Sequence, residues 1–91
     1  GPRDNITRED LAVMLRNYAK YKGKDTMTIT NLAGFKDWQE IDTYANTAMQ
    51  WAVGKGVITG DLGNKLLNPK NTATRAEAAS MIFKYCVKLE V

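Results

Sequence analysis

The chain has 91 residues, of which 44% are hydrophobic and 25% are charged, and its formal net charge is +3. This composition is ordinary for one small folded domain, and the charge is far below the dense basic stripe of a nucleic-acid binder. The sequence has no histidine and one cysteine, which excludes a histidine-activated nucleophile and an intramolecular disulfide. No apolar run approaches the ~18 residues that a membrane-spanning helix requires.

Residues 1–2 are Gly-Pro, which has the form of a scar left by protease cleavage, and no methionine starts the chain. We therefore expect a piece of a longer protein and treat residues 1–2 as a scar outside the domain. A chain of this length buries only a thin core, so we expect it to draw additional stability from a neighbouring repeat or a partner.

The first predicted helix begins at Thr7, which is its N-cap. Asp10 stands three residues later, in the spacing of a capping box, although glutamate is the usual acid there. Gly23 ends the helix, and residues 24–34 are polar, rich in threonine and without a helical period, which predicts a linker or a short extended segment. The apolar residues of the helix form one stripe: Leu11, Met14, Leu15 and Tyr18.

The second predicted helix covers residues 43–55 and is capped by Asp42 or Thr43. Gly56 follows it, at the position where a left-handed residue ends a helix. Its apolar positions include small alanines, which favours close approach of another helix, and Trp51 lies among them as an expected core residue. These positions are Ala45, Ala48, Met49, Ala52 and Val53.

The loop after this helix has the composition of an ordered turn region. Gly60 and Gly63 predict tight turns, and Pro69 stops any regular element. Leu66 and Leu67 are expected to point inward and to close the loop over the core.

The third predicted helix begins at Thr74, whose capping-box partner is Glu77. Cys86 lies beside the apolar stripe of this helix, and we expect it to be buried as a small hydrophobic residue. The chain is therefore predicted to be mainly α, with three helices joined by ordered loops. The stripe of the third helix consists of Ala78, Met81, Ile82, Tyr85 and Leu89.

The first and third helices repeat one another. Thr7-Arg8 aligns with Thr74-Arg75, and the same offset brings further identical residues into register. Matching polarity through a whole helix at such a long period predicts an internal repeat. The identical pairs are Ala12 with Ala79, Met14 with Met81, and Tyr18 with Tyr85.

The order of these parts resembles the S-layer homology repeat, a mainly α helix-loop-helix unit. Each motif alone is short, and the ordered set is what makes the resemblance specific. The matching positions are Phe35 and Asp37 at the opening, GVITG at residues 56–60, Gly63 and Pro69 in the loop, and TRAE at residues 74–77.

The resemblance implies the C-terminal half of one repeat over residues 3–23, a linker over residues 24–34, and a complete second repeat over residues 35–91. Two departures stand out, because Tyr44 replaces a common tryptophan and the first Thr-Arg motif reads TRED, without the alanine. Anchoring domains of this family usually carry three repeats. This chain has about one and a half repeats. We therefore expect its terminal helices to expose apolar surface that neighbouring repeats would otherwise cover.

The resemblance implies non-covalent, non-catalytic anchoring of an exported protein to the envelope of a Gram-positive bacterium. The implied location is extracellular, at the cell wall or S-layer. The implied ligand is a secondary cell-wall polysaccharide, often with acidic pyruvyl ketals, held between adjacent repeats by the arginine of the Thr-Arg motif. Neighbouring repeats or self-association are the implied protein contacts, with no nucleic acid, membrane insertion, cofactor or metal.

Arg8 and Arg75 each occupy the first position of a predicted helix. The helix macrodipole is positive at this end and disfavours a cation by ~0.3–1 kcal/mol, so helix stability does not explain these arginines. One explanation is a carboxylate or pyruvyl ketal ligand, which would meet a planar bidentate donor and free backbone N–H groups together. The other is pairing with an acid such as Asp37 or Asp61, as in a structural or protein–protein repeat without glycan affinity.

The other candidate ligand-binding residues each have a structural alternative. Asp37 is either a turn acceptor or a partner of sugar hydroxyls, and Trp38 either stacks on a pyranose or packs against the third helix. Gly60 is a turn glycine that also admits close approach of a ligand, and Asp61 beside it offers acceptors to sugar hydroxyls. Glu77 mainly caps its helix. The predicted ligand-binding set is Arg8, Asp37, Trp38, Gly60, Asp61, Arg75 and Glu77.

Overall fold

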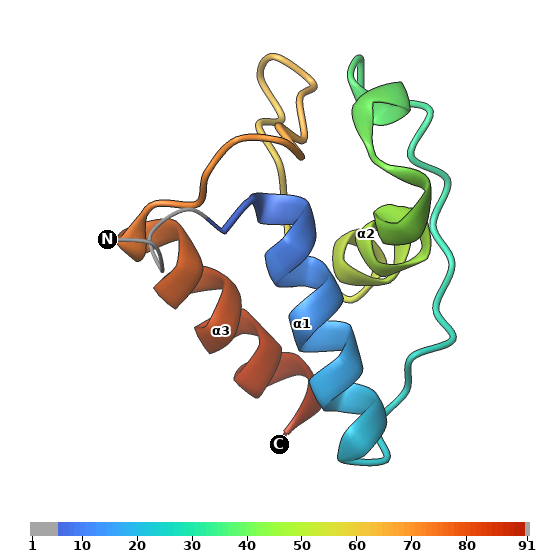
Figure 1. Cartoon of the computed structure of the whole chain (residues 1–91), viewed down its shortest axis with the longest axis vertical. Coiled ribbons are helices and arrows are strands. Elements are labelled where there is room, and N and C mark those ends of the chain that lie inside the picture. Colours follow the sequence, from blue (N-terminus) through green and yellow to red (C-terminus); the bar gives the residue numbers. More distant parts are fainter. Residues whose placement is uncertain (1–5, 91) are drawn as a thin grey trace.

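A computed structural model describes residues 6–90, so the predicted scar and the start of the first half repeat lie outside the described residues. The described residues fold into three α-helices, and α1 packs against both α2 and α3 (Figure 1). The prediction of a mainly α fold with three helices is confirmed. The helices are α1 (Arg8–Tyr21), α2 (Asn46–Gly54) and α3 (Arg75–Leu89), and the short 3₁₀ helices η2 (Trp38–Glu40) and η3 (Thr43–Ala45) precede α2.

The two Thr-Arg motifs start α1 and α3 as predicted, but only the second forms a complete capping box. Thr74 Oγ1 accepts a hydrogen bond from Glu77 N at 3.0 Å, and Thr74 N donates to Glu77 Oε1 at 2.8 Å. Thr7 Oγ1 accepts from Asp10 N at 3.2 Å. The Asp10 carboxylate accepts from the Tyr44 hydroxyl, so the first helix uses its acid for a long-range contact.

The loop of residues 69–73 covers the N-terminus of α1. Arg8 N donates to Asn71 O at 3.0 Å, and Glu9 N donates to Pro69 O at 3.0 Å. The first N–H groups of a helix have no partner within the helix itself. Here the loop of residues 69–73 supplies these partners, so the start of α1 is joined through the backbone to the segment before α3.

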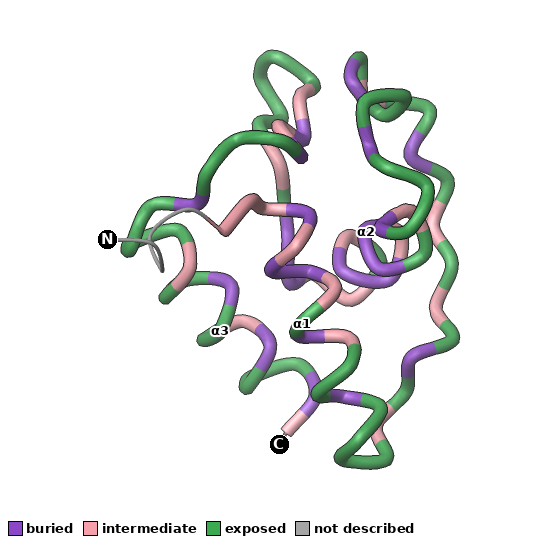
Figure 2. The backbone as a smooth tube through the Cα atoms, viewed as in Figure 1, coloured by how far each residue is buried: buried purple, intermediate pink, exposed green. Residues whose placement is uncertain are grey.

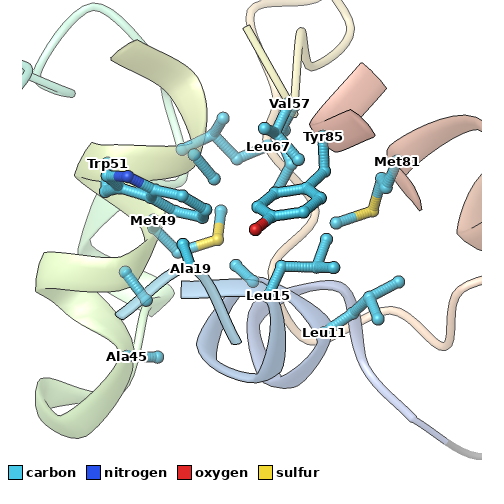
Figure 3. Close-up of a cluster of buried hydrophobic side chains, with 14 of the residues drawn as sticks. Leu11, Leu15, Ala19, Ala45, Met49, Trp51, Val57, Leu67, Met81 and Tyr85 are labelled. Atoms are coloured by element: carbon cyan, nitrogen blue, oxygen red, sulfur yellow. The ribbon is translucent and has the colours of Figure 1, made fainter. Parts of the chain in front are cut away.

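The core lies where the three helices meet the loop between α2 and α3 (Figures 2 and 3). The Trp51 indole is fully buried, and its Nε1–H donates to Asp25 O at 2.8 Å, which fastens the linker to α2. The Tyr85 ring of α3 faces this indole with ring centroids 6.4 Å apart. The predicted core position of Trp51 and the inward position of Leu67 are confirmed.

Residues 24–34 contain no helix or strand, yet they are fastened along the domain. Arg16 donates from Nε and Nη2 to Thr26 O at 3.2 and 3.1 Å. Asp25 forms an ion pair with Lys55 at 2.7 Å. The segment therefore has a fixed course beside α2 and does not act as a free tether (Figure 1).

The predicted burial of Cys86 is wrong, and its exposure identifies an uncovered face of α3. Cys86 is exposed, and Ile82, one turn earlier, is 46% exposed. Leu15 and Ala19 hold the corresponding repeat positions on α1 and are buried, because α1 packs against α2. No second copy of α2 covers α3 within residues 6–90, which explains the difference (Figure 2).

Candidate functional site

Arg8 reaches from the start of α1 toward α3. Its Nε donates to Leu67 O at 3.1 Å, and its Nη1 lies 3.2 Å from Glu77 Oε2. The side chain is 14% exposed, so the guanidinium is fixed at the rim between buried and open surface. A guanidinium has five N–H donors, and these contacts leave others available to a ligand. Arg8 does pair with an acid, but the acid is Glu77 and neither Asp37 nor Asp61.

Beside Arg8 lies an open hollow of about 270 Å³ between the start of α1, the segment after α2 and one face of α3, here called the Arg8 hollow. Its charged side chains are Arg8, Lys84 and Glu77, which leaves an excess of positive charge. The Thr59 and Ser80 hydroxyls add neutral donors and acceptors. This combination suits an oxygen-rich ligand that carries an acidic group. The complete lining is Arg8, Val57, Ile58, Thr59, Ala76, Glu77, Ser80, Met81 and Lys84.

Arg75 occupies the same place in its motif as Arg8 but has different surroundings. It is exposed, and it forms no ion pair with any residue from 6 to 90. The partners of Arg8 come from the loop and the helix that follow it in the chain. No segment of residues 6–90 takes the corresponding place beside Arg75.

Asp37 anchors the loop that carries Leu67. The Asp37 carboxylate is buried, and its two oxygens accept from Leu67 N at 2.8 Å and Asn68 N at 2.7 Å. These contacts agree with the turn-acceptor alternative, and Asp37 does not line the Arg8 hollow. Because Leu67 O holds the Arg8 side chain, Asp37 positions that arginine indirectly.

Gly60 and Asp61 shape the turn after α2 and do not line the Arg8 hollow. Gly60 has a φ of +72°, and a Cβ at this position would lie 2.9 Å from the Phe35 ring, so the turn requires glycine. Asp61 accepts from Asn64 N at 3.1 Å and from Asn64 Nδ2 at 2.9 Å. The hydrogen bond from the Asn64 side chain lowers the pKa of Asp61.

Trp38 lies in η2, directly after Asp37, and is 38% exposed. It lines a second hollow together with linker residues and with Asn46 and Gln50 of α2. Figure 1 places η2 at the end of the molecule away from α3. The alternative in which Trp38 packs against the third helix is therefore wrong.

The sequence does not predict the buried ion cluster around Glu9. Glu9 is 1% exposed and accepts from Asp42 N and Lys70 Nζ, both at 3.1 Å. Lys70 also pairs with Asp42, and their hydrogen bond raises the pKa of Lys70 and lowers the pKa of Asp42. The sequence signal for this cluster is the TRED motif, in which Glu9 replaces the alanine that is usual in the family pattern.

Ser80 and Lys84 are further additions to the predicted set. They lie one and two turns after Glu77 on α3, so the three residues share one face of the helix. Helical spacing groups these side chains, but the packing of α3 against α1 decides that this face meets Arg8.

The Tyr44 hydroxyl introduces a pH dependence at this end of α1. Its hydrogen bond to Asp10, with desolvation and nearby carboxylates, raises the pKa of Tyr44 from 10.0 to about 12. The contribution of the neutral phenol to stability is therefore complete below pH ~10 and is lost as the pH rises toward 12.

We expect the urea midpoint of Tyr44→Phe to fall less than that of the wild type between pH ~10 and 12. An equal fall in both proteins would contradict the assignment.

Two similar helix starts, the first of them hydrogen-bonded to the loop before α3, and a polar hollow between α1 and α3 characterise this helical domain. A family model for the S-layer homology domain matches residues 34–79, about half of the chain. The chain belongs to the S-layer homology domain family, and the domain that defines this family is a non-catalytic module. Membership of the family indicates association with the cell surface.

Three relatives share this part of their sequence with the chain. The amylopullulanase of Thermoanaerobacterium thermosulfurigenes is 35% identical over 86 residues, which cover 90% of the chain and 4% of that protein. The exoglucanase XynX of Acetivibrio thermocellus is 34% identical over 83 residues, which cover 90% of the chain and 8% of that protein. The surface-layer 125 kDa protein of Lysinibacillus sphaericus is 42% identical over 62 residues, which cover 68% of the chain and 5% of that protein.

The chain thus spans less than a tenth of the length of each of these relatives. No solved structure gives a significant match to the chain. Within residues 6–90, no helix has the length and apolar character needed to cross a membrane.

Proposed function

We propose that the chain is a cell-envelope anchoring module that binds an acidic secondary cell-wall polysaccharide in the hollow beside Arg8. The observation that carries this proposal is the placement of Arg8, whose guanidinium is held at the rim of the hollow by Leu67 O and Glu77. A cation is unfavourable at the first position of a helix, which favours a ligand role for this arginine. The proposal places the protein outside the cell, at the wall or S-layer of a Gram-positive bacterium.

An acidic sugar residue would find complementary groups in this hollow. The carboxylate of a pyruvyl ketal would lie against the free N–H groups of Arg8 and the ammonium group of Lys84. Sugar hydroxyls would exchange hydrogen bonds with Thr59 and Ser80. Glu77 offsets part of the positive charge, so the hollow favours a ligand with single acidic groups over a dense polyanion.

A neighbouring repeat is the proposed protein partner of α3. Leu15 and Ala19 are buried on α1, whereas Ile82 and Cys86 at the matching positions of α3 are exposed. A following repeat would bring its own second helix to this stripe and its own loop to Arg75. Self-association of the chain through the same stripe is the alternative.

A structural repeat without glycan affinity is the second candidate function. The observation that favours it is the existing engagement of Arg8 with Glu77 and Leu67 O. In that case Arg8 only joins α1 to the next unit. The two candidates differ in the role of Lys84, because Lys84 lines the hollow and forms no ion pair within residues 6–90.

Binding to purified Gram-positive sacculi tests the proposal. We expect the wild type to sediment with sacculi and to remain in solution after mild acid has removed the secondary polysaccharide. Lys84→Gln should weaken binding roughly tenfold or more, because a hydrogen bond to a charged group contributes ~1.5–3 kcal/mol. Lys88→Gln is the matched control, since it removes the same charge one turn later on α3, outside the hollow.

Two outcomes would count against polysaccharide binding at this site. Equal sacculus binding by the Lys84 and Lys88 variants would show that charge in the hollow is not used. Sedimentation that survives acid extraction would show that a wall component other than the secondary polysaccharide is bound.

A further inference from the structure

A second hollow lies between the linker and α2, and it shares no lining residue with the Arg8 hollow. Its volume is about 270 Å³. Trp38 lines it together with Asn31 of the linker and with Asn46 and Gln50 of α2. In Figure 1 the linker runs beside α2 on the side away from α3, so this hollow is separate from the proposed acidic-polysaccharide site.

The lining of this second hollow contains no charged side chain, in contrast to the Arg8 hollow. Its polar side chains are amides and one threonine hydroxyl. An acidic ligand would lose water here without gaining an opposite charge, which is costly. The chemistry of the hollow therefore favours an uncharged ligand.

The amides of this hollow retain unused hydrogen-bonding capacity. Asn31 Oδ1 accepts from Ala33 N at 2.9 Å, and Asn46 Oδ1 accepts from Gln50 Nε2. As far as residues 6–90 are concerned, the Asn31 and Asn46 amino groups remain free to donate and the Gln50 carbonyl remains free to accept. A set with both donors and acceptors matches sugar hydroxyls, because each hydroxyl donates and accepts.

Trp38 adds an accessible apolar surface to these amides. It is 38% exposed, whereas Trp51, the other tryptophan of the chain, is fully buried. Ile29, which is 77% exposed, extends the apolar edge of the hollow. An aromatic ring beside a few directed polar groups is the combination that binds a ring with one apolar face and polar edges, such as a pyranose.

We propose that this hollow is a second glycan subsite, which binds an uncharged pyranose residue. The subsite is separate from the Arg8 hollow and depends on neither Arg8 nor Lys84. The two hollows would then select different sugars, acidic residues beside Arg8 and neutral residues beside Trp38.

Titration of the whole chain with triacetylchitotriose, an uncharged trisaccharide, tests this subsite. Because Trp51 is buried, changes in tryptophan emission and in acrylamide quenching report on Trp38. We expect a saturable change with a Kd on the order of 1 mM, which is typical of a small exposed site. The fluorescence change should persist when the Lys84→Gln variant is titrated with the same trisaccharide. In the wild type it should be weaker with trigalacturonic acid, an anionic trisaccharide of similar size.

Calorimetric titration of variants identifies the residues involved. Trp38→Leu and Gln50→Ala should each weaken trisaccharide binding about fivefold or more, through loss of the aromatic face or of an amide partner. Tyr21→Leu is the matched control, because it removes an aromatic ring that is 84% exposed and lines neither hollow. If Trp38→Leu does not fold, Gln50→Ala decides the outcome.

The absence of any response from the wild type at ~10 mM trisaccharide, ten times the expected Kd, would overturn the proposal. Equal weakening by Tyr21→Leu, or stronger binding of trigalacturonic acid, would also overturn it. A wild type that responds to the trisaccharide but does not sediment with sacculi would support this subsite. It would contradict only the proposed binding of acidic polysaccharide in the Arg8 hollow.

Discussion

Replacement of Asp37 by alanine is expected to lower the free energy of unfolding by ~2–4 kcal/mol. The Asp37 carboxylate is buried and accepts hydrogen bonds from Leu67 N and Asn68 N. Alanine would leave both N–H groups without this partner, and each such loss costs ~1–3 kcal/mol. The loop would also hold Leu67 O less firmly, so the Arg8 side chain should become more mobile. Urea unfolding curves measure the first effect.

Asp61→Ala is the matched control for this prediction. Asp61 also fastens a loop, but it is exposed and its partner is the neighbouring Asn64. Its replacement should lower the urea midpoint much less than Asp37→Ala does, because water replaces the lost hydrogen bonds. The stability loss of Asp37→Asn should lie between those of Asp37→Ala and Asp61→Ala, because the amide oxygen of asparagine can still accept one of the two hydrogen bonds. A cost for Asp37→Ala no greater than that for Asp61→Ala would refute the anchoring role.

Lys70→Ala is expected to destabilise the protein more than Glu9→Ala does. Lys70→Ala leaves the buried Glu9 carboxylate without its cation, so we expect a clear fall in the melting temperature. The loss stays below that of a fully buried pair, because the Lys70 side chain is 43% exposed and Asp42 N still donates to Glu9. Glu9→Ala removes the buried charge itself and leaves Lys70 paired with Asp42.

The double variant Glu9→Ala with Lys70→Ala separates this explanation from simple loss of packing. It should be more stable than Lys70→Ala alone, because no charge is left buried without a partner. Thermal unfolding of the four proteins at one pH and salt concentration measures the coupling. A double variant that is less stable than both single variants would show that the ion cluster does not explain the effect.

Local features of the fold are predictable from the sequence because neighbouring residues determine them. Thr74 and Glu77 are three residues apart, so the capping box follows from helix geometry alone. Trp51 lies among small apolar residues at helical spacing, and it is the largest fully buried side chain. Both features are indicated by residues of one helix, although Asp25 and Tyr85 from other segments complete the burial of Trp51.

The candidate site is less predictable because it depends on contacts between distant segments. The sequence indicates that Arg8 needs a partner, but only the packing of α1 against α3 and the loop before it selects Glu77 and Leu67 O. The buried position of Glu9 has the same origin. Cys86 is apolar in its pattern and exposed in the structure, because no segment of residues 6–90 packs over that stripe of α3.

The most direct test of the central claim is an NMR titration of the ¹⁵N-labelled chain with a purified pyruvylated wall polysaccharide fragment. We predict saturable shifts of the Arg8 Nε–H and of the Ser80 and Lys84 amides, because these residues line the proposed groove. The shifts should disappear once mild acid has removed the ketals. Shifts confined to other parts of the chain, or no shifts at a concentration that saturates sacculus binding, would contradict the claim.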